Sequence, residues 1–159
     1  MTTHGATWSD LERQEGVDLG SSAPRVIDQA MVDAHAATTG DAQWIHNDPE
    51  RARAESPFGG PVVQGFLLLS LLTAHGAALR IPEAGNVAML VNYGFDRVRF
   101  VAPVPVGAAV HVHGTLAEVR PKDDDRAVVV FDVTMRAQVG DAPPLDAVVA
   151  RWCFLLVRP

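Results

Sequence analysis

The longest apolar run of the chain, residues 62–79, reads VVQGFLLLSLLTAHGAAL. A helix that spans a bilayer needs about 20 predominantly apolar residues. This run is shorter, and it is interrupted by Gln64, Ser70, Thr73 and His75. We therefore expect a helix that is buried on nearly all sides inside a folded domain. The rest of the fold has to cover this helix.

The residues after Pro82 change from a helical period to a period of two. From Phe131 to Val139, apolar and polar side chains alternate as they do in a half-buried strand. Near Gly94 the apolar side chains switch faces, which indicates a β-bulge. We predict strands over residues 87–101, 108–120, 131–139 and 146–157, with turns at 122–126 and 140–144.

Three helix starts precede the apolar run. Ser9 and Glu12 fit a capping box, and Asp28 and Asp48 are typical caps of two further helices. Gly16 and Gly20 are expected to break the chain after the first helix. We predict helices from Asp10, over residues 29–38 and over residues 49–54, with a short strand over 25–27.

Helices followed by antiparallel strands indicate an α+β fold in which a curved sheet wraps around the long central helix. A chain of 159 residues has the size of one domain, so we expect residues 1–159 to form a single domain. The protein has a net charge of −6 and no cluster of Lys or Arg, so nucleic acid is not an expected partner.

Nothing in the sequence predicts export or membrane contact. The stretch from Met1 to Asp10 is polar and lacks the basic and apolar regions of a signal peptide. The single cysteine, Cys153, lies in an apolar strand-like run and is expected in the core. We therefore expect a cytoplasmic protein.

The residues suited to chemistry are concentrated in residues 39–73, TGDAQWIHNDPERARAESPFGGPVVQGFLLLSLLT. Asp41 and His46 lie there in a loop between two predicted helices. A carboxylate and an imidazole can together bind and deprotonate a water molecule near neutral pH. The alternative is a loop aspartate that caps a helix and a histidine on the surface.

Gly65 falls in the first turn of the apolar helix, after the turn formed by Gly59, Gly60 and Pro61. First-turn N–H groups have no acceptor within their helix, and the helix dipole favours negative charge there. A glycine also lets a substrate carbonyl approach the backbone. This is the layout of an oxyanion hole, although a tight turn into a helix also favours glycine.

This stretch resembles the signature of the MaoC-like (R)-specific enoyl-CoA hydratases, which commonly reads GD-x-N-P-x-H-x-D-P followed by G-P-I-V-H-G. Two segments, QWIH at 43–46 and NYGFDRVRFVAPVPVG at 92–107, more closely resemble the nodulation-protein-N-like branch of that family. The resemblance covers roughly residues 25–107. It implies a hot-dog fold, a homodimer, a coenzyme A or acyl-carrier-protein thioester as ligand, and neither a cofactor nor a metal.

The resemblance also implies roles for individual residues. The catalytic pair of the family matches Asp41 and His46, its oxyanion-binding amide matches Gly65, and a supporting hydroxyl matches Thr73. The sequence departs from the family at Gln43, between the catalytic pair, and at Gln64, where His is usual. We expect Gln64→His to preserve or raise activity. The substrate contacts that we expect are Gly60, Gln64, Arg97 and Arg99, the two arginines facing coenzyme A phosphates unless they belong to an ordinary charged sheet face.

The expected reaction is the reversible hydration of a trans-2-enoyl thioester to the (3R)-3-hydroxyacyl thioester. The alternatives are a 3-hydroxyacyl-carrier-protein dehydratase, a hot-dog thioesterase and a non-catalytic acyl-binding protein. His111 and His113 share one side of a predicted strand, but no third ligand is evident, so we expect a solvated face and no metal site.

Overall fold

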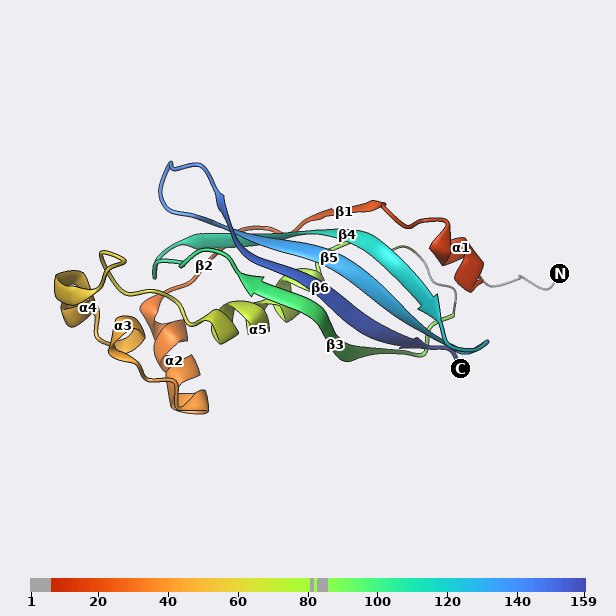
Figure 1. The fold of residues 1–159 in the computed structure, drawn as a ribbon, viewed down its shortest axis with the longest axis horizontal. Coiled ribbons are helices and arrows are strands. Elements are labelled where there is room, and N and C mark those ends of the chain that lie inside the picture. Colours follow the sequence, from red (N-terminus) through yellow and green to blue (C-terminus); the bar gives the residue numbers. More distant parts are fainter. Residues whose placement is uncertain (1–6, 81, 83–85) are drawn as a thin grey trace.

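A curved antiparallel sheet and a helix along one of its faces form the body of the protein (Figure 1). The computed structural model describes residues 7–80, 82 and 86–159. Within these residues the sheet has six strands in the order β1-β4-β5-β6-β3, and β2 also pairs with β4. The strands are β1 (Asp18–Ser21), β2 (Arg25–Val26), β3 (Met89–Phe100), β4 (Ala109–Pro121), β5 (Arg126–Gln138) and β6 (Leu145–Val157).

The helix that lies along the sheet is α5 (Gly65–Gly76), and it comes from the apolar run that the sequence singles out. Three further helices gather beyond one end of the sheet, and α1 lies near the other end (Figure 1). The predicted caps Asp28 and Asp48 are confirmed, because they accept hydrogen bonds from the N–H groups of Met31 and Arg51. These four helices are α1 (Trp8–Glu12), α2 (Gln29–Thr39), α3 (Trp44–Asn47) and α4 (Pro49–Glu55).

The four long strands are confirmed, and so is the bulge at Gly94, where the register of β3 on β6 shifts. The predictions for the segment before β2 are less accurate. The capping box of α1 joins Thr7 to Asp10, so the prediction of Ser9 and Glu12 is wrong. Gly20 does not simply break a helix, because it lies in β1, a strand too short to show a period of two.

Only one side of α5 is buried by its own chain. Leu67, Leu68, Leu71 and Leu72 pack into the core, whereas the side chain of Phe66 is 67% exposed. The expectation of burial on nearly all sides is therefore wrong for the isolated chain, because the sheet curves around one side of the helix only. The sheet contributes the rest of the core mainly from β4, β5 and β6, including Val110, Val112, Leu116, Phe131, Val133, Met135, Ala150, Trp152 and Leu156.

Cys153 is buried, as expected, but on the other face of the sheet from α5. It packs with Val130 in a small apolar cluster. Over this face, the carboxylate of Glu118 forms ion pairs with both Arg120 and Arg151. Burial raises the pKa of the Cys153 thiol, which therefore stays protonated and unreactive near neutral pH.

The β3 edge of the sheet is long and apolar. Within the described ranges β3 pairs with β6 alone, and five of its large apolar side chains are exposed. Phe66 of α5 lies beside this edge, with its ring 6.2 Å from that of Phe100. Unpaired strand edges and exposed apolar patches are typical of protein interfaces. The exposed side chains of β3 are Met89, Leu90, Val91, Tyr93 and Phe100.

We predict that a second copy of the chain covers this edge, which gives a homodimer at micromolar concentration. Val91→Glu should shift the protein toward monomer, because it introduces a charge into the apolar contact. Val139→Glu is the matched control, since Val139 is also exposed but lies beyond the end of β5. Sedimentation velocity measures the outcome, and a wild type that stays monomeric would contradict the prediction.

Candidate active site

The loop that carries Asp41 is folded back onto the start of α5. Gly40 ends α2 in the left-handed conformation, with φ 81°, which turns the chain sharply before Asp41. The buried amide of Gln64 then donates to two backbone carbonyls, that of Asp41 at 3.4 Å and that of Val32 at 3.1 Å. The half-buried Asp41 is therefore tied through its backbone to the residue that precedes α5.

His46 is buried, and a single contact determines which ring nitrogen carries its proton. Its Nδ1 lies 2.6 Å from the backbone oxygen of Val62. A carbonyl oxygen only accepts hydrogen bonds, so Nδ1 must carry the proton and donate it. In the neutral ring, Nε2 then keeps its lone pair. Within the described ranges Nε2 makes no hydrogen bond, and it is not among the enclosed polar atoms, so it can act as a base on a small molecule.

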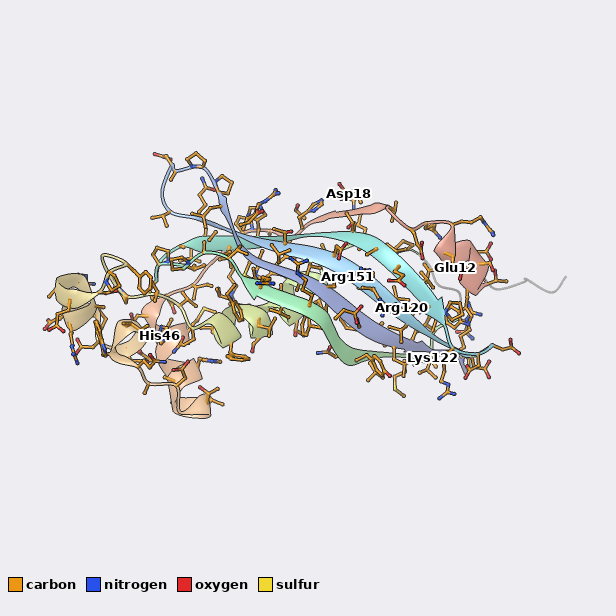
Figure 2. The ribbon with its side chains drawn as sticks, viewed as in Figure 1. Glu12, Asp18, His46, Arg120, Lys122 and Arg151 are labelled. Atoms are coloured by element: carbon orange, nitrogen blue, oxygen red, sulfur yellow. The ribbon has the colours of Figure 1, made fainter. Side chains whose placement is uncertain are left out.

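The short helix α3, which carries His46, is itself held by hydrogen bonds on two sides. On one side, the Gln29 amide of α2 donates to the backbone oxygen of His46 at 2.8 Å, and Asn47 donates to Asp33 at 2.7 Å. On the other side, the N–H of Val62 donates to the backbone oxygen of Ile45. Figure 2 shows His46 at the end of the molecule where α2, α3 and α4 meet.

The N-terminus of α5, which follows Val62 in the chain, presents unpaired backbone donors. The preceding residue, Gln64, makes no side-chain cap. The N–H groups of Gly65, Phe66 and Leu67 have no acceptor in the part of the chain that the structure describes. A Cβ at position 65 would lie 3.2 Å from the ring of Phe100, which is a tight contact. Close packing therefore favours glycine here, and the open amides can stabilise an oxyanion.

The structure gathers some of the predicted residues and separates others. Hydrogen bonds connect His46 to Val62 and Gln64 to Asp41, and Gly65 follows Gln64 directly. No hydrogen bond joins Asp41 to His46 within the described residues. The exposed side chain of Gln43 reaches Asp41 at 3.5 Å, the limit of a hydrogen bond. Gln64 has no exposed surface, so direct contact between its side chain and a substrate is not supported.

Thr73, Arg97 and Arg99 lie away from this group. Thr73 is eight residues beyond Gly65, which corresponds to about 12 Å along a helix. Arg97 and Arg99 are exposed on β3, where neither forms an ion pair with another described residue. No hydrogen bond or ion pair joins these three residues to Asp41 or His46 in the described part of the chain, and the role predicted for each remains a prediction.

Among the described residues, one hollow lies before α5 and three more are lined by residues of α5. The first, of about 480 Å³, is lined by Arg53, Phe58 and Gly60. Phe58 also lines the second, of about 300 Å³, together with Gly65 and Phe100. The third, of about 290 Å³, lies on the other side of the Phe66–Phe100 ring contact. It shares Thr73 and Trp152 with the fourth, an apolar chamber of about 190 Å³ at the end of the helix that also includes Gly76, Phe131 and Phe154.

Sequence reasoning missed Arg53, Gly76 and Trp152 as lining residues. Arg53 lies in the helix that the Asp48-Pro49 start predicts, but no local sequence pattern distinguishes it from Arg51 as a lining residue. Gly76 and Trp152 meet only in the folded chain, where a Cβ on Gly76 would lie 2.9 Å from the Trp152 ring. No periodicity in the sequence could reveal that contact.

Comparison with known proteins agrees with this arrangement. Residues 10–138 match the family described as the MaoC like domain. The chain belongs to the MaoC-like family. It is 40% identical to "Nodulation protein N" of Rhizobium meliloti (strain 1021), over 91% of this chain and 89% of that protein. It is 37% identical to "3-hydroxyacyl-thioester dehydratase Z" of Mycobacterium tuberculosis (strain ATCC 25618 / H37Rv), over 86% and 87%.

Solved structures show that this MaoC-like chain has the hot-dog fold of its family. The R-hydratase PhaJ1 from Pseudomonas aeruginosa superposes with a TM-score of 0.67 at 20% identity, covering 98% of this chain and 88% of that one. The predicted α+β hot-dog architecture is therefore confirmed. No helix in the described residues is long and apolar enough to cross a membrane. Nor do those residues hold a cluster of three metal-binding side chains, and His113 pairs with Asp18.

The two hydrogen bonds of Gln64 lead to a prediction for this MaoC-like site. Gln64→His should retain activity, because an imidazole N–H can still donate to one of the two carbonyls. Gln64→Leu should lower turnover, because both buried carbonyls lose their donor and Asp41 is no longer tied to α5. Steady-state kinetics on a short enoyl-CoA, with thermal melts to confirm folding, measure both variants. A large loss in folded Gln64→His would mean that the site requires both donors of Gln64.

Proposed function

We propose that the protein catalyses the reversible hydration of trans-2-enoyl thioesters to (3R)-3-hydroxyacyl thioesters. The observation that carries the proposal is the state of His46, whose Nδ1–H donates to Val62 while Nε2 makes no hydrogen bond with a described residue. The unpaired amides of α5 begin three residues after Val62. A base next to donors for a developing negative charge suits addition to a carbon–carbon double bond conjugated with a thioester. Membership of the MaoC-like family, with a 3-hydroxyacyl-thioester dehydratase among its relatives, supports the same chemistry.

In the proposed reaction, Asp41 and His46 hold one water molecule between them. The water oxygen bonds to carbon 3 as a proton passes to one member of the pair, and the double-bond electrons move toward the thioester oxygen. The N–H of Gly65 stabilises that oxygen. A proton then reaches carbon 2 with the help of the other member, so that H and OH have been added and nothing has been oxidised. Because the pair acts on one water, we assign the two proton transfers to the pair as a unit.

Coenzyme A esters fit the surroundings of the site better than carrier-protein esters. Residues 28–55 contain six Asp or Glu and two Arg, and this segment forms α2, α3 and α4 around His46. An acyl carrier protein presents an acidic surface over a broad contact, which an acidic rim repels, whereas the phosphates of coenzyme A need only a local positive charge such as that of Arg53. We therefore propose coenzyme A thioesters as the substrates, with a carrier-protein dehydratase as the alternative that a basic rim would have favoured.

Two connected hollows along α5 offer an apolar binding site for the acyl chain. The third hollow leads from the first turns of α5 to the 190 Å³ chamber next to Gly76, and the chamber is lined almost entirely by apolar side chains. Hydrocarbon gains free energy when it leaves water for such a lining. We propose that this chamber receives the acyl tail.

A panel of trans-2-enoyl-CoA esters of increasing chain length tests the proposal. Hydration should remove the ultraviolet absorbance of the conjugated thioester, and chiral analysis should find the (3R)-alcohol. Release of free thiol would identify a thioesterase instead. No turnover across the panel, with a folded protein that still binds acyl-CoA, would identify a non-catalytic acyl-binding protein.

A further inference from the structure

The hollow between α4 and the loop 58–61 has one charged residue, Arg53, among the described residues that line it. Its volume is about 480 Å³, and it lies on the side of Phe58 away from the hollow that holds Gly65. Arg53 projects from α4 into its lining, and no carboxylate joins it there. The hollow therefore presents a local positive charge within a segment whose net charge is negative.

Arg53 differs from the other arginine of the same helix. Arg51 is engaged twice, with its Nε 2.9 Å from a carboxylate oxygen of Glu55 and its guanidinium 4.4 Å from the Trp44 ring centre. Among the described residues Arg53 makes no ion pair, although Glu50 lies three residues before it. Its five N–H donors are thus available to a ligand.

A backbone donor lies in the same lining. The N–H of Gly60 makes no hydrogen bond with any residue that the structure describes. Gly59, just before it, has a φ of 75°, a left-handed conformation that glycine adopts without strain. Together, Arg53 and the amide of Gly60 form a pair of donors of the kind that binds phosphate oxygens.

The position of this pair fits a coenzyme A ester whose thioester oxygen is at Gly65. Gly60 and Gly65 are five residues apart, which places their Cα atoms within about 18 Å of each other. The two hollows share Phe58, so a pantetheine arm can pass from one to the other. Arg97 and Arg99, which the sequence suggested for this role, line neither hollow.

We propose that Arg53, with the N–H of Gly60, binds a phosphate group of the coenzyme A part of the substrate. The planar guanidinium matches a phosphate with two parallel hydrogen bonds, which an ammonium group cannot do. This proposal rests on the hydratase function proposed above, because it takes the thioester to be at Gly65. In this proposal, the hollow beside α4 is the part of the protein that selects coenzyme A esters over thioesters without phosphate.

Two substrates and two arginine variants test the proposal. Crotonyl-CoA carries the phosphates, whereas the crotonyl thioester of N-acetylcysteamine has none. Arg53→Ala should raise KM for crotonyl-CoA on the order of 10-fold, the effect of losing a hydrogen bond to a charged group, and leave KM for the short thioester unchanged. Arg51→Ala removes the same charge two residues away and should change neither KM. Equal effects of Arg53→Ala on both substrates, or no effect on either, would overturn the proposal.

Calorimetric titration with free coenzyme A separates this proposal from the hydratase function. Wild type and Arg51→Ala should bind coenzyme A more tightly than Arg53→Ala by the same factor that we expect for KM. The affinity of Arg53→Lys should lie between them. Pantetheine, which lacks phosphate, should bind all of them equally. If no enoyl thioester is hydrated but coenzyme A binding depends on Arg53, the hydratase function fails and the phosphate site stands. If hydration proceeds and coenzyme A binds Arg53→Ala as tightly as wild type, the phosphate site fails alone.

Discussion

Asp41→Asn and His46→Gln should each lower the turnover of a short enoyl-CoA by about 10²–10⁴-fold, the range for a lost general acid or base. Asn keeps the size of Asp41 but removes its basic oxygen. Gln at position 46 can still donate to the carbonyl of Val62, but its amide has no basic nitrogen that can accept a proton. Binding of a saturated acyl-CoA should change little, because neither residue lines the hollows that we propose for the acyl chain and the pantetheine arm.

The double variant makes the test stricter. Groups that act on one water as a unit are not additive, so Asp41→Asn/His46→Gln should be little slower than the slower single variant. His111→Gln and Asp125→Asn are matched controls, since both residues lie outside this site. Turnover is measured from the loss of ultraviolet absorbance, with thermal melts to confirm folding. A folded single variant with wild-type turnover would rule out the proposed mechanism.

Gly76→Val should abolish most activity on long enoyl-CoA esters while sparing crotonyl-CoA. A Cβ at position 76 would lie 2.9 Å from the Trp152 ring, so the added methyl groups must occupy the chamber that we assign to the acyl tail. A misfit of one methylene in an apolar pocket changes specificity by about 10–200-fold, so we expect a loss on the order of 100-fold in kcat/KM for long chains. The four-carbon chain ends before it reaches the chamber.

Kinetics across a chain-length series measure this effect, and Ala74→Val is the matched control. It adds two methyl groups to a side chain of α5 at an exposed position outside the chamber. Trp152 provides a second readout, because a long acyl-CoA in the chamber should change its fluorescence in wild type but not in Gly76→Val. Equal loss of activity on short and long chains in folded Gly76→Val would show that the acyl tail binds elsewhere.

Much of this protein follows from local sequence. The apolar run became α5, the caps Asp28 and Asp48 begin α2 and α4, and the four long strands follow the period of two. Asp41 and His46 could be singled out because they lie five residues apart in the sequence, although the predicted loop is wrong for His46, which lies in α3. Signals of this kind act over a few residues, and the sequence shows them directly.

Only the tertiary structure decided how these parts serve a site. The proton of His46 is placed by Val62, sixteen residues away, and the need for glycine at position 65 is set by the ring of Phe100 on β3. The curvature of the sheet leaves the β3 edge uncovered, and Gly76 meets Trp152 across the core. Each of these depends on contacts between residues far apart in the chain. Such contacts form only when the whole chain packs, so neither propensity nor spacing along the sequence encodes them separately.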